Sequence, residues 1–255
     1  MTYCAAITLN RGLIFVSDSR TNAGVDQIST YSKMHTLIAD GERMITLLSS
    51  GNLATSQAVV RQLRRDLETG NACNLKTVQH LAEVAEYVGE LSVERRLKHR
   101  NAADAKFETR FDPEACFIVG GQIAGREPQI FLVYPEGNHI RASAETPYLQ
   151  IGEVKYGKPI LDRIICDNLS LEDAALCALV SMDSTVRSNV TVGPPIELLI
   201  YATDSLNEGS RLLLAEDDPY LYALRKGWQS GLQKAFASLP RLPGSAMPHV
   251  RLVDG

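Results

Sequence analysis

The sequence predicts an α+β fold in which two packed β-sheets are flanked by helices. Strand-like segments occur in runs, and pairs of amphipathic helical segments separate these runs. This order favours stacked layers over the alternating strand–helix units of a parallel sheet. The length of 255 residues fits one large domain, because cores tend to split only beyond about 250 residues.

The chain begins with two predicted hairpins. Residues 2–9 (TYCAAITL) and 13–18 (LIFVSD) are apolar and partly β-branched, and an Asn-Arg-Gly turn signal separates them. Residues 33–40 and 43–50 (RMITLLSS) form a second pair around an Asp-Gly turn. We therefore expect the second residue of the chain to lie already inside a sheet.

Two amphipathic helices are expected next. Apolar residues recur at three- and four-residue spacing over 53–67 and again over 75–97. The polar segment 98–112 is expected to be a surface loop or extension.

The second half of the chain repeats this order. Ser170 and Asp173 form a predicted capping pair at the start of a helix, and we expect a C-terminal helix and tail from about residue 216 within a single domain of 1–255. The expected elements are strands at 115–120, 129–134, 139–143 and 196–202 and helices near 157–166, from Ser170 and over 218–238.

Composition excludes several classes of protein. The net charge of −4 argues against a nucleic-acid partner. No run of about 18 apolar residues is present, so no membrane span is expected. Five cysteines without CxxC spacing, and an N-terminus unlike a signal peptide, indicate a reducing cytoplasm. Scattered histidines without HExxH predict neither a metal nor another cofactor.

Four residues form a candidate catalytic group. Thr2 follows the initiator methionine, Asp18 ends the second strand, Lys33 begins the third, and Gly51 lies between the fourth strand and a helix. A threonine hydroxyl is a weak nucleophile that needs a base, and removal of Met1 would leave an α-amine on the same residue. The ordinary pKa of an α-amine, about 7.7–8.0, suits a base at neutral pH.

The other three residues would support this nucleophile. The Lys33 charge would lower the proton affinity of the amine and stabilise a developing alkoxide. Asp18 would hold Lys33 and balance its charge. The Gly51 N–H would be the oxyanion donor at a loop-to-helix junction.

These segments resemble the proteasome β subunits and the related bacterial heat-shock peptidase, which are N-terminal nucleophile hydrolases. SDSRTNAG after the second strand matches their aspartate loop, and FIVGGQ…QIFLVYPEGN matches their central hairpin. The Met-Thr start and the C-terminal helix and tail resemble the bacterial Anbu group most closely. The resemblance implies a four-layer αββα sandwich, a homo-oligomer forming an open ring or spiral, and a peptide or protein substrate.

The outer part of the site departs from the proteasome pattern. Glu153 stands near the expected serine, while Ser188 and Thr191 take the places of an aspartate and a serine. We keep Glu153, Ser188 and Thr191 as supporting candidates that would orient the threonine amine.

Two alternatives to a threonine peptidase stay open at this point. One is a self-assembling structural particle with weak or lost proteolysis, which the altered outer residues favour. The other is a small-amide hydrolase of the same superfamily. Oligomeric state separates them, because inward-facing sites of a multimer suit peptides and an open pocket on a monomer suits an amidase. The sequence does not indicate a cleavage preference, a subunit number or an ATPase partner.

Overall fold

The computed structural model describes residues 1–22, 28–70, 74–104 and 113–240. By internal contacts the chain divides into two compact units, Met1–Asp218 and Pro219–Gly255. The second unit contains helix α5 (Pro219–Ala237). The boundary lies close to residue 216, and all residues of the candidate site belong to the first unit.

One five-stranded sheet has the order β10-β1-β2-β11-β12, and all its pairs are antiparallel. Its central hairpin is the predicted one, with Leu9 opposite Gly12 at the turn. Its strands are β1 (Tyr3–Leu9), β2 (Gly12–Asp18), β10 (Tyr148–Gly152), β11 (Ile196–Ala202) and β12 (Ser210–Leu214).

The second five-stranded sheet runs in sequence order, β5-β6-β7-β8-β9, and is also antiparallel. A separate two-stranded ribbon, β3 (Arg20–Asn22) with β4 (Ile28–Thr30), connects the first sheet to it. The strands of the second sheet are β5 (Met34–Ala39), β6 (Arg43–Gly51), β7 (Ala115–Ile123), β8 (Gln129–Val133) and β9 (His139–Arg141).

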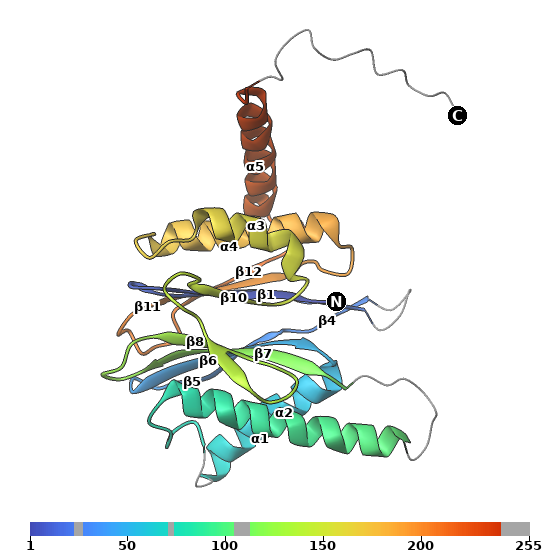
Figure 1. Cartoon of the computed structure of the whole chain (residues 1–255), viewed down its shortest axis with the longest axis vertical. Helices are drawn as coiled ribbons and strands as arrows, with labels where there is room; N and C mark the ends of the chain where they lie inside the picture. The colour runs from blue at the N-terminus through green and yellow to red at the C-terminus, as the bar shows by residue number, and fades with distance from the viewer. Residues whose placement is uncertain (23–27, 71–73, 105–112, 241–255) are drawn as a thin grey trace. The chain divides into compact units, whose positions relative to one another are not determined.

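Helices pack on both sheets (Figure 1). Helices α1 (Leu53–Thr69) and α2 (Leu81–Asp104) contact the second sheet. Helix α4 (Leu171–Ser188) lies on β1, β2 and β11, and α3 (Val154–Ile164) packs against α4 and β10. The sheets themselves contact each other, with β1 and β10 against β6, β7 and β8. The first unit is therefore an α+β structure with two sheets and two helix pairs.

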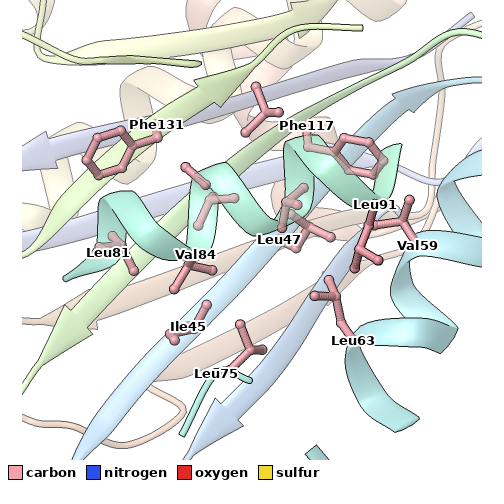
Figure 2. Close-up of a cluster of buried hydrophobic side chains, with 14 of the residues drawn as sticks. Ile45, Leu47, Val59, Leu63, Leu75, Leu81, Val84, Leu91, Phe117 and Phe131 are labelled. Carbon is pink, nitrogen blue, oxygen red and sulfur yellow. The ribbon is translucent and has the colours of Figure 1, made fainter. Parts of the chain in front are cut away.

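Two buried apolar clusters hold these layers together. The cluster in Figure 2 fills the space between α1, α2 and the second sheet, and it includes Leu47, Leu63, Val84 and Phe117. A second cluster lies between the sheets. It contains Cys4, Ala6, Leu13, Phe15, Met34, Met44, Leu48, Ile118, Ile130, Leu149, Ile151, Leu199 and Tyr201.

Two helices, α1 and α4, begin with side-chain caps. The Asn52 side chain accepts a hydrogen bond from the Thr55 N–H at the start of α1. The Ser170 hydroxyl accepts one from the Asp173 N–H at the start of α4, 3.0 Å apart, which confirms the predicted capping pair.

Several predicted boundaries were wrong. Residues 98–104 continue α2 instead of forming a loop, and residues 105–112 lie outside the described part of the chain. That helix begins at Leu81, because turns occupy the residues just before it. Strands β3, β4 and β10 were not predicted. Among the described residues, no helix is both long enough and apolar enough to cross a membrane.

Candidate active site

Thr2 lies immediately before β1 and is 8% exposed. Its carbonyl oxygen accepts a hydrogen bond from the Glu153 N–H at 2.8 Å. The next residue, Tyr3, pairs with Gly152 of β10, and a Cβ on Gly152 would lie 1.9 Å from the Thr2 carbonyl oxygen. The backbone of Thr2 is therefore closely held, whereas its hydroxyl has no hydrogen-bond partner within the described ranges.

Asp18 connects three segments that are distant in the sequence. Its carboxylate ends β2 and is fully buried. One oxygen accepts from the Tyr3 N–H at 3.0 Å and from the Lys33 ammonium at 2.7 Å. The other oxygen accepts from the Gly193 N–H at 3.3 Å. One carboxylate therefore joins the start of β1, the start of β5 and the loop after α4.

Lys33 is 5% exposed and lies directly before β5. Its Nζ donates to Asp18 and also to the Arg20 carbonyl oxygen at 2.7 Å. Its own carbonyl accepts from the Ser49 N–H at 3.0 Å. Both ends of the side chain are therefore fixed, which holds the ammonium beside the start of β1.

The electrostatics of the chain's α-amine reflect this arrangement. Burial, and next the charge of Lys33, lower the pKa of the Met1 α-amine, and the carboxylates of Asp18 and Glu153 act against this. Burial raises the pKa of the Asp18 carboxyl, and the Lys33 charge and the backbone donors oppose the rise. The Met1 α-amine is thus shifted towards its neutral form.

The Gly51 N–H points away from β7. Gly51 lies opposite Ala115, and the Asn52 N–H donates to the Glu114 carbonyl at 2.7 Å. That bond marks Gly51 and Ala115 as a non-hydrogen-bonded pair, in which the two residues do not donate to each other. The Gly51 N–H therefore points to the side of β6 on which β5 lies, as the Ser49 N–H does. Because β5 starts at Met34, opposite Leu48, no β5 residue lies opposite Gly51. Within the described residues no acceptor is recorded for it.

Gly51 also has a backbone that other residues rarely adopt. Its φ is +94°, and a Cβ there would lie 2.4 Å from the Glu114 carbonyl oxygen. Glycine is therefore required for this strand end to approach β7.

Among the supporting candidates, only Glu153 lies beside Thr2. Its N–H contacts the Thr2 carbonyl, and its carboxylate lies 3.5 Å from the Lys155 ammonium. Ser188 is exposed at the last position of α4. The Thr191 hydroxyl donates to the Asn189 side chain at 2.6 Å. Thr2 therefore contacts Glu153 directly, and the Asp18–Lys33 pair reaches Thr2 through the backbone of Tyr3. No such contact is recorded for Ser188 or Thr191 among the described residues.

Two contributors to this site, Gly193 and Glu197, were not predicted from the sequence. Gly193 donates its N–H to Asp18, and a Cβ on it would lie 2.4 Å from the Arg20 guanidinium carbon. A backbone donor has no side-chain signature, although the glycine before two prolines could have indicated a constrained turn. Glu197 is a buried carboxylate that contacts Ser19. A charged residue within the apolar run IELLIYA could have indicated it.

Neither a protein-family model nor a curated protein matches the chain. Several solved structures do match the chain. "Anbu (ancestral beta-subunit)" from Yersinia bercovieri is 44% identical with a TM-score of 0.88, and the match covers 96% of this chain and 100% of that one. The chain belongs to the Anbu family.

Two further Anbu structures support this assignment. The helical assembly of the Anbu complex from Pseudomonas aeruginosa is 43% identical, covers 96% of this chain and 100% of its own, and has a TM-score of 0.89. An Anbu (Gly-1) mutant from Hyphomicrobium sp. strain MC1 is 42% identical over 95% of this chain and 100% of its own, with a TM-score of 0.86. The matches extend along nearly the whole Anbu chain, and the family is related to the proteasome β subunits.

Proposed function

We propose that this Anbu chain is an N-terminal threonine hydrolase that cleaves peptide bonds, and that its first unit is the four-layer αββα sandwich of the N-terminal nucleophile hydrolases. One observation carries the proposal. The Asp18 carboxylate holds the Lys33 ammonium at 2.7 Å and also holds the backbone of Tyr3, the residue after Thr2. The charge that would activate a threonine is thereby fixed next to that threonine.

The proposed reaction begins after Met1 is removed, when the α-amine belongs to Thr2. This amine takes the proton of the Thr2 hydroxyl while Oγ forms a bond to the substrate carbonyl carbon. The Gly51 N–H stabilises the oxyanion of the tetrahedral intermediate. The C–N bond then breaks, the leaving amine takes the proton from the α-ammonium, and water later hydrolyses the Thr2 ester. Lys33 lowers the pKa of the amine and stabilises the alkoxide throughout.

We also propose that the chain assembles into a homo-oligomer, an open ring or spiral, in the cytoplasm. The P. aeruginosa relative is described as a helical assembly. Within the second unit of this chain, α5 exposes large apolar side chains, among them Tyr222 (68%) and Phe236 (70%). Exposed apolar groups of this size favour subunit contacts. Light scattering that gave the monomer mass of 28.0 kDa at micromolar concentration would contradict the assembly.

Labelling with an electrophile tests the catalytic proposal. Intact mass first shows whether Met1 is lost. A peptide epoxyketone, which reacts with both a hydroxyl and a free α-amine, should then add one inhibitor mass to the processed chain. Thr2→Ala and Lys33→Ala should abolish labelling, and Thr2→Ser should retain part of it. Thr203→Ala is the matched control, because Thr203 is a half-buried threonine just beyond the end of β11 and far from the chain start in sequence.

The altered outer residues favour one alternative. Because Ser188 is exposed and Thr191 is bonded to Asn189, a structural assembly with a decayed site is the second candidate. A processed wild-type chain that resists the epoxyketone at high concentration would favour it over the hydrolase. Equal labelling of Thr2→Ala would instead contradict Thr2 as the nucleophile.

A further inference from the structure

An ion pair with one buried partner, Glu197, and one exposed partner, Arg211, lies behind the Lys33 site. Glu197 of β11 is 4% exposed, and its carboxylate contacts the Arg211 guanidinium of β12. The same carboxylate accepts a hydrogen bond from the Ser19 hydroxyl at 3.3 Å. Glu197 thus contacts both the neighbouring strand and the segment that follows β2.

Arg211 extends this connection to the second sheet. The guanidinium nitrogen that contacts Glu197 also donates to the Met34 carbonyl oxygen at 3.1 Å. Met34 is the first residue of β5 and directly follows Lys33 in the chain. The ion pair therefore holds the backbone from which the Lys33 side chain extends.

Glu197 and Arg211 each hold one of the two chain segments that meet at the Lys33 ammonium. Ser19 lies between Asp18 and Arg20, whose carboxylate and carbonyl oxygens both accept hydrogen bonds from Lys33 Nζ. Glu197 holds the segment of these acceptors, and Arg211 holds the segment of the donor.

The geometry points to Glu197 and Arg211 as a positioning pair, which sets the place of the Lys33 ammonium by fixing the acceptor segment at Ser19 and the donor segment at Met34. Neither residue contacts Thr2, so both act through Lys33. This role rests on the proposed function, because Lys33 is the residue that would activate Thr2.

A role in stability alone accounts poorly for this pair. Burying the Glu197 carboxylate removes its charge from water, and an ion pair whose other partner is exposed adds little to stability. The remaining hydrogen bonds of the pair go to the segments that flank Lys33. A pair retained for orientation should therefore affect the chemical step more than a more deeply buried arginine elsewhere.

Arg43 provides a matched control. It is 8% exposed and lies at the opposite end of β6 from Gly51, where its guanidinium donates to the carbonyls of Leu75 and Val78. Arg43→Met and Arg211→Met both remove a guanidinium that donates to carbonyl oxygens. Arg43 is the more deeply buried of the two and lies far from Lys33, so Arg43→Met is the more demanding test of a general packing effect.

The first experiment separates binding from chemistry in the assembled, processed protein. For a peptide epoxyketone, Arg211→Met and Glu197→Gln should lower kinact by about tenfold, because a displaced reacting group loses its near-attack geometry. KI should stay unchanged, since neither residue lies against the substrate site. Arg211→Lys should recover part of kinact, and Arg43→Met should keep the wild-type value. If a single variant does not fold, the double variant Arg211→Met/Glu197→Gln avoids an unpaired buried charge.

The second experiment needs no activity from Thr2. Lys33 in the wild type should react slowly with acetic anhydride, because its ammonium is buried and bonded to Asp18. Mass spectrometry of peptides should show that Arg211→Met accelerates acetylation of Lys33 several-fold and that Arg43→Met does not.

These readouts separate failure of the inference from failure of the proposed function. A lower kinact together with faster acetylation of Lys33 supports the positioning pair. Unchanged values for both, or equal changes in Arg43→Met, overturn it. If the processed wild type is not labelled at all, the proposed function fails, and the acetylation rate of Lys33 alone decides the inference.

Discussion

Gly152→Ala should misplace the backbone of Thr2. A Cβ at residue 152 would lie 1.9 Å from the Thr2 carbonyl oxygen and 2.7 Å from its carbon. Because non-bonded heavy atoms settle at about 3.5 Å, the Thr2 carbonyl must move by more than about 1 Å. A displacement of that size near a reacting group lowers the rate by about a hundredfold. The shift should also weaken the Glu153–Thr2 backbone hydrogen bond, at a cost of about 1 kcal/mol.

Gly41→Ala isolates the collision from backbone strain. Gly41 has φ +87° and Gly152 has φ +85°, but a Cβ on Gly41 meets no atom within 4 Å. Both variants therefore carry the left-handed strain of about 1–2 kcal/mol, and only Gly152→Ala collides with Thr2. We expect Gly41→Ala to be labelled by the epoxyketone at the wild-type rate, and Gly152→Ala to be labelled about a hundredfold more slowly.

The assay is the labelling rate of processed chains, measured alongside urea unfolding. Gly152→Ala should unfold at lower urea than Gly41→Ala, because of the extra collision. If a folded Gly152→Ala chain were labelled as fast as Gly41→Ala, the close approach of β10 to Thr2 would not be what positions the nucleophile.

Three further predictions concern stability, each measured by urea unfolding. Asp18→Asn should lower the free energy of unfolding by about 3 kcal/mol, because it leaves the Lys33 ammonium buried without a countercharge. Asp162→Asn, which removes one partner of an exposed ion pair, should lower it by less than about 0.5 kcal/mol. Burial lowers the pKa of His35 from 6.5 to about 4. Between these two pH values the unfolded chain binds more protons than the folded chain. The free energy of unfolding should therefore fall, by up to about 3 kcal/mol, as the pH drops through this window. His35→Gln should flatten that part of the profile, and an unchanged profile would contradict the burial of the ring. Ser170→Ala should cost about 1 kcal/mol through loss of the cap, and an equal stability of this variant and the wild type would contradict the capping role.

The elements that sequence predicted well carry local signals. The first hairpin shows apolar runs around a turn, and α4 shows a cap followed by regular apolar spacing. Strand β10 has only five residues and pairs with β1 across more than a hundred intervening residues, so its local pattern was weak. The last turns of α2 lack an apolar stripe, which is why 98–104 was predicted as a loop.

The same distinction applies to the site. Thr2, Asp18 and Lys33 were predicted because each contributes a distinctive side chain at the end of a recognisable strand. Gly193 and Glu153 contribute backbone N–H groups to the site, and an N–H is common to every residue except proline. Such contacts become visible only when the chain is folded and distant segments meet.

The three-way connection at Asp18 has a consequence for comparing relatives. Its carboxylate joins β1, β5 and the Gly193 loop, so a lineage that lost hydrolysis would still need it to keep these segments together. The Thr2 hydroxyl makes no such structural contact among the described residues. Selection for the fold alone would therefore allow Thr2 to be replaced by another residue. An aspartate at this position therefore says little about whether a distant relative is an enzyme, and the residue that follows its initiator methionine is the informative one.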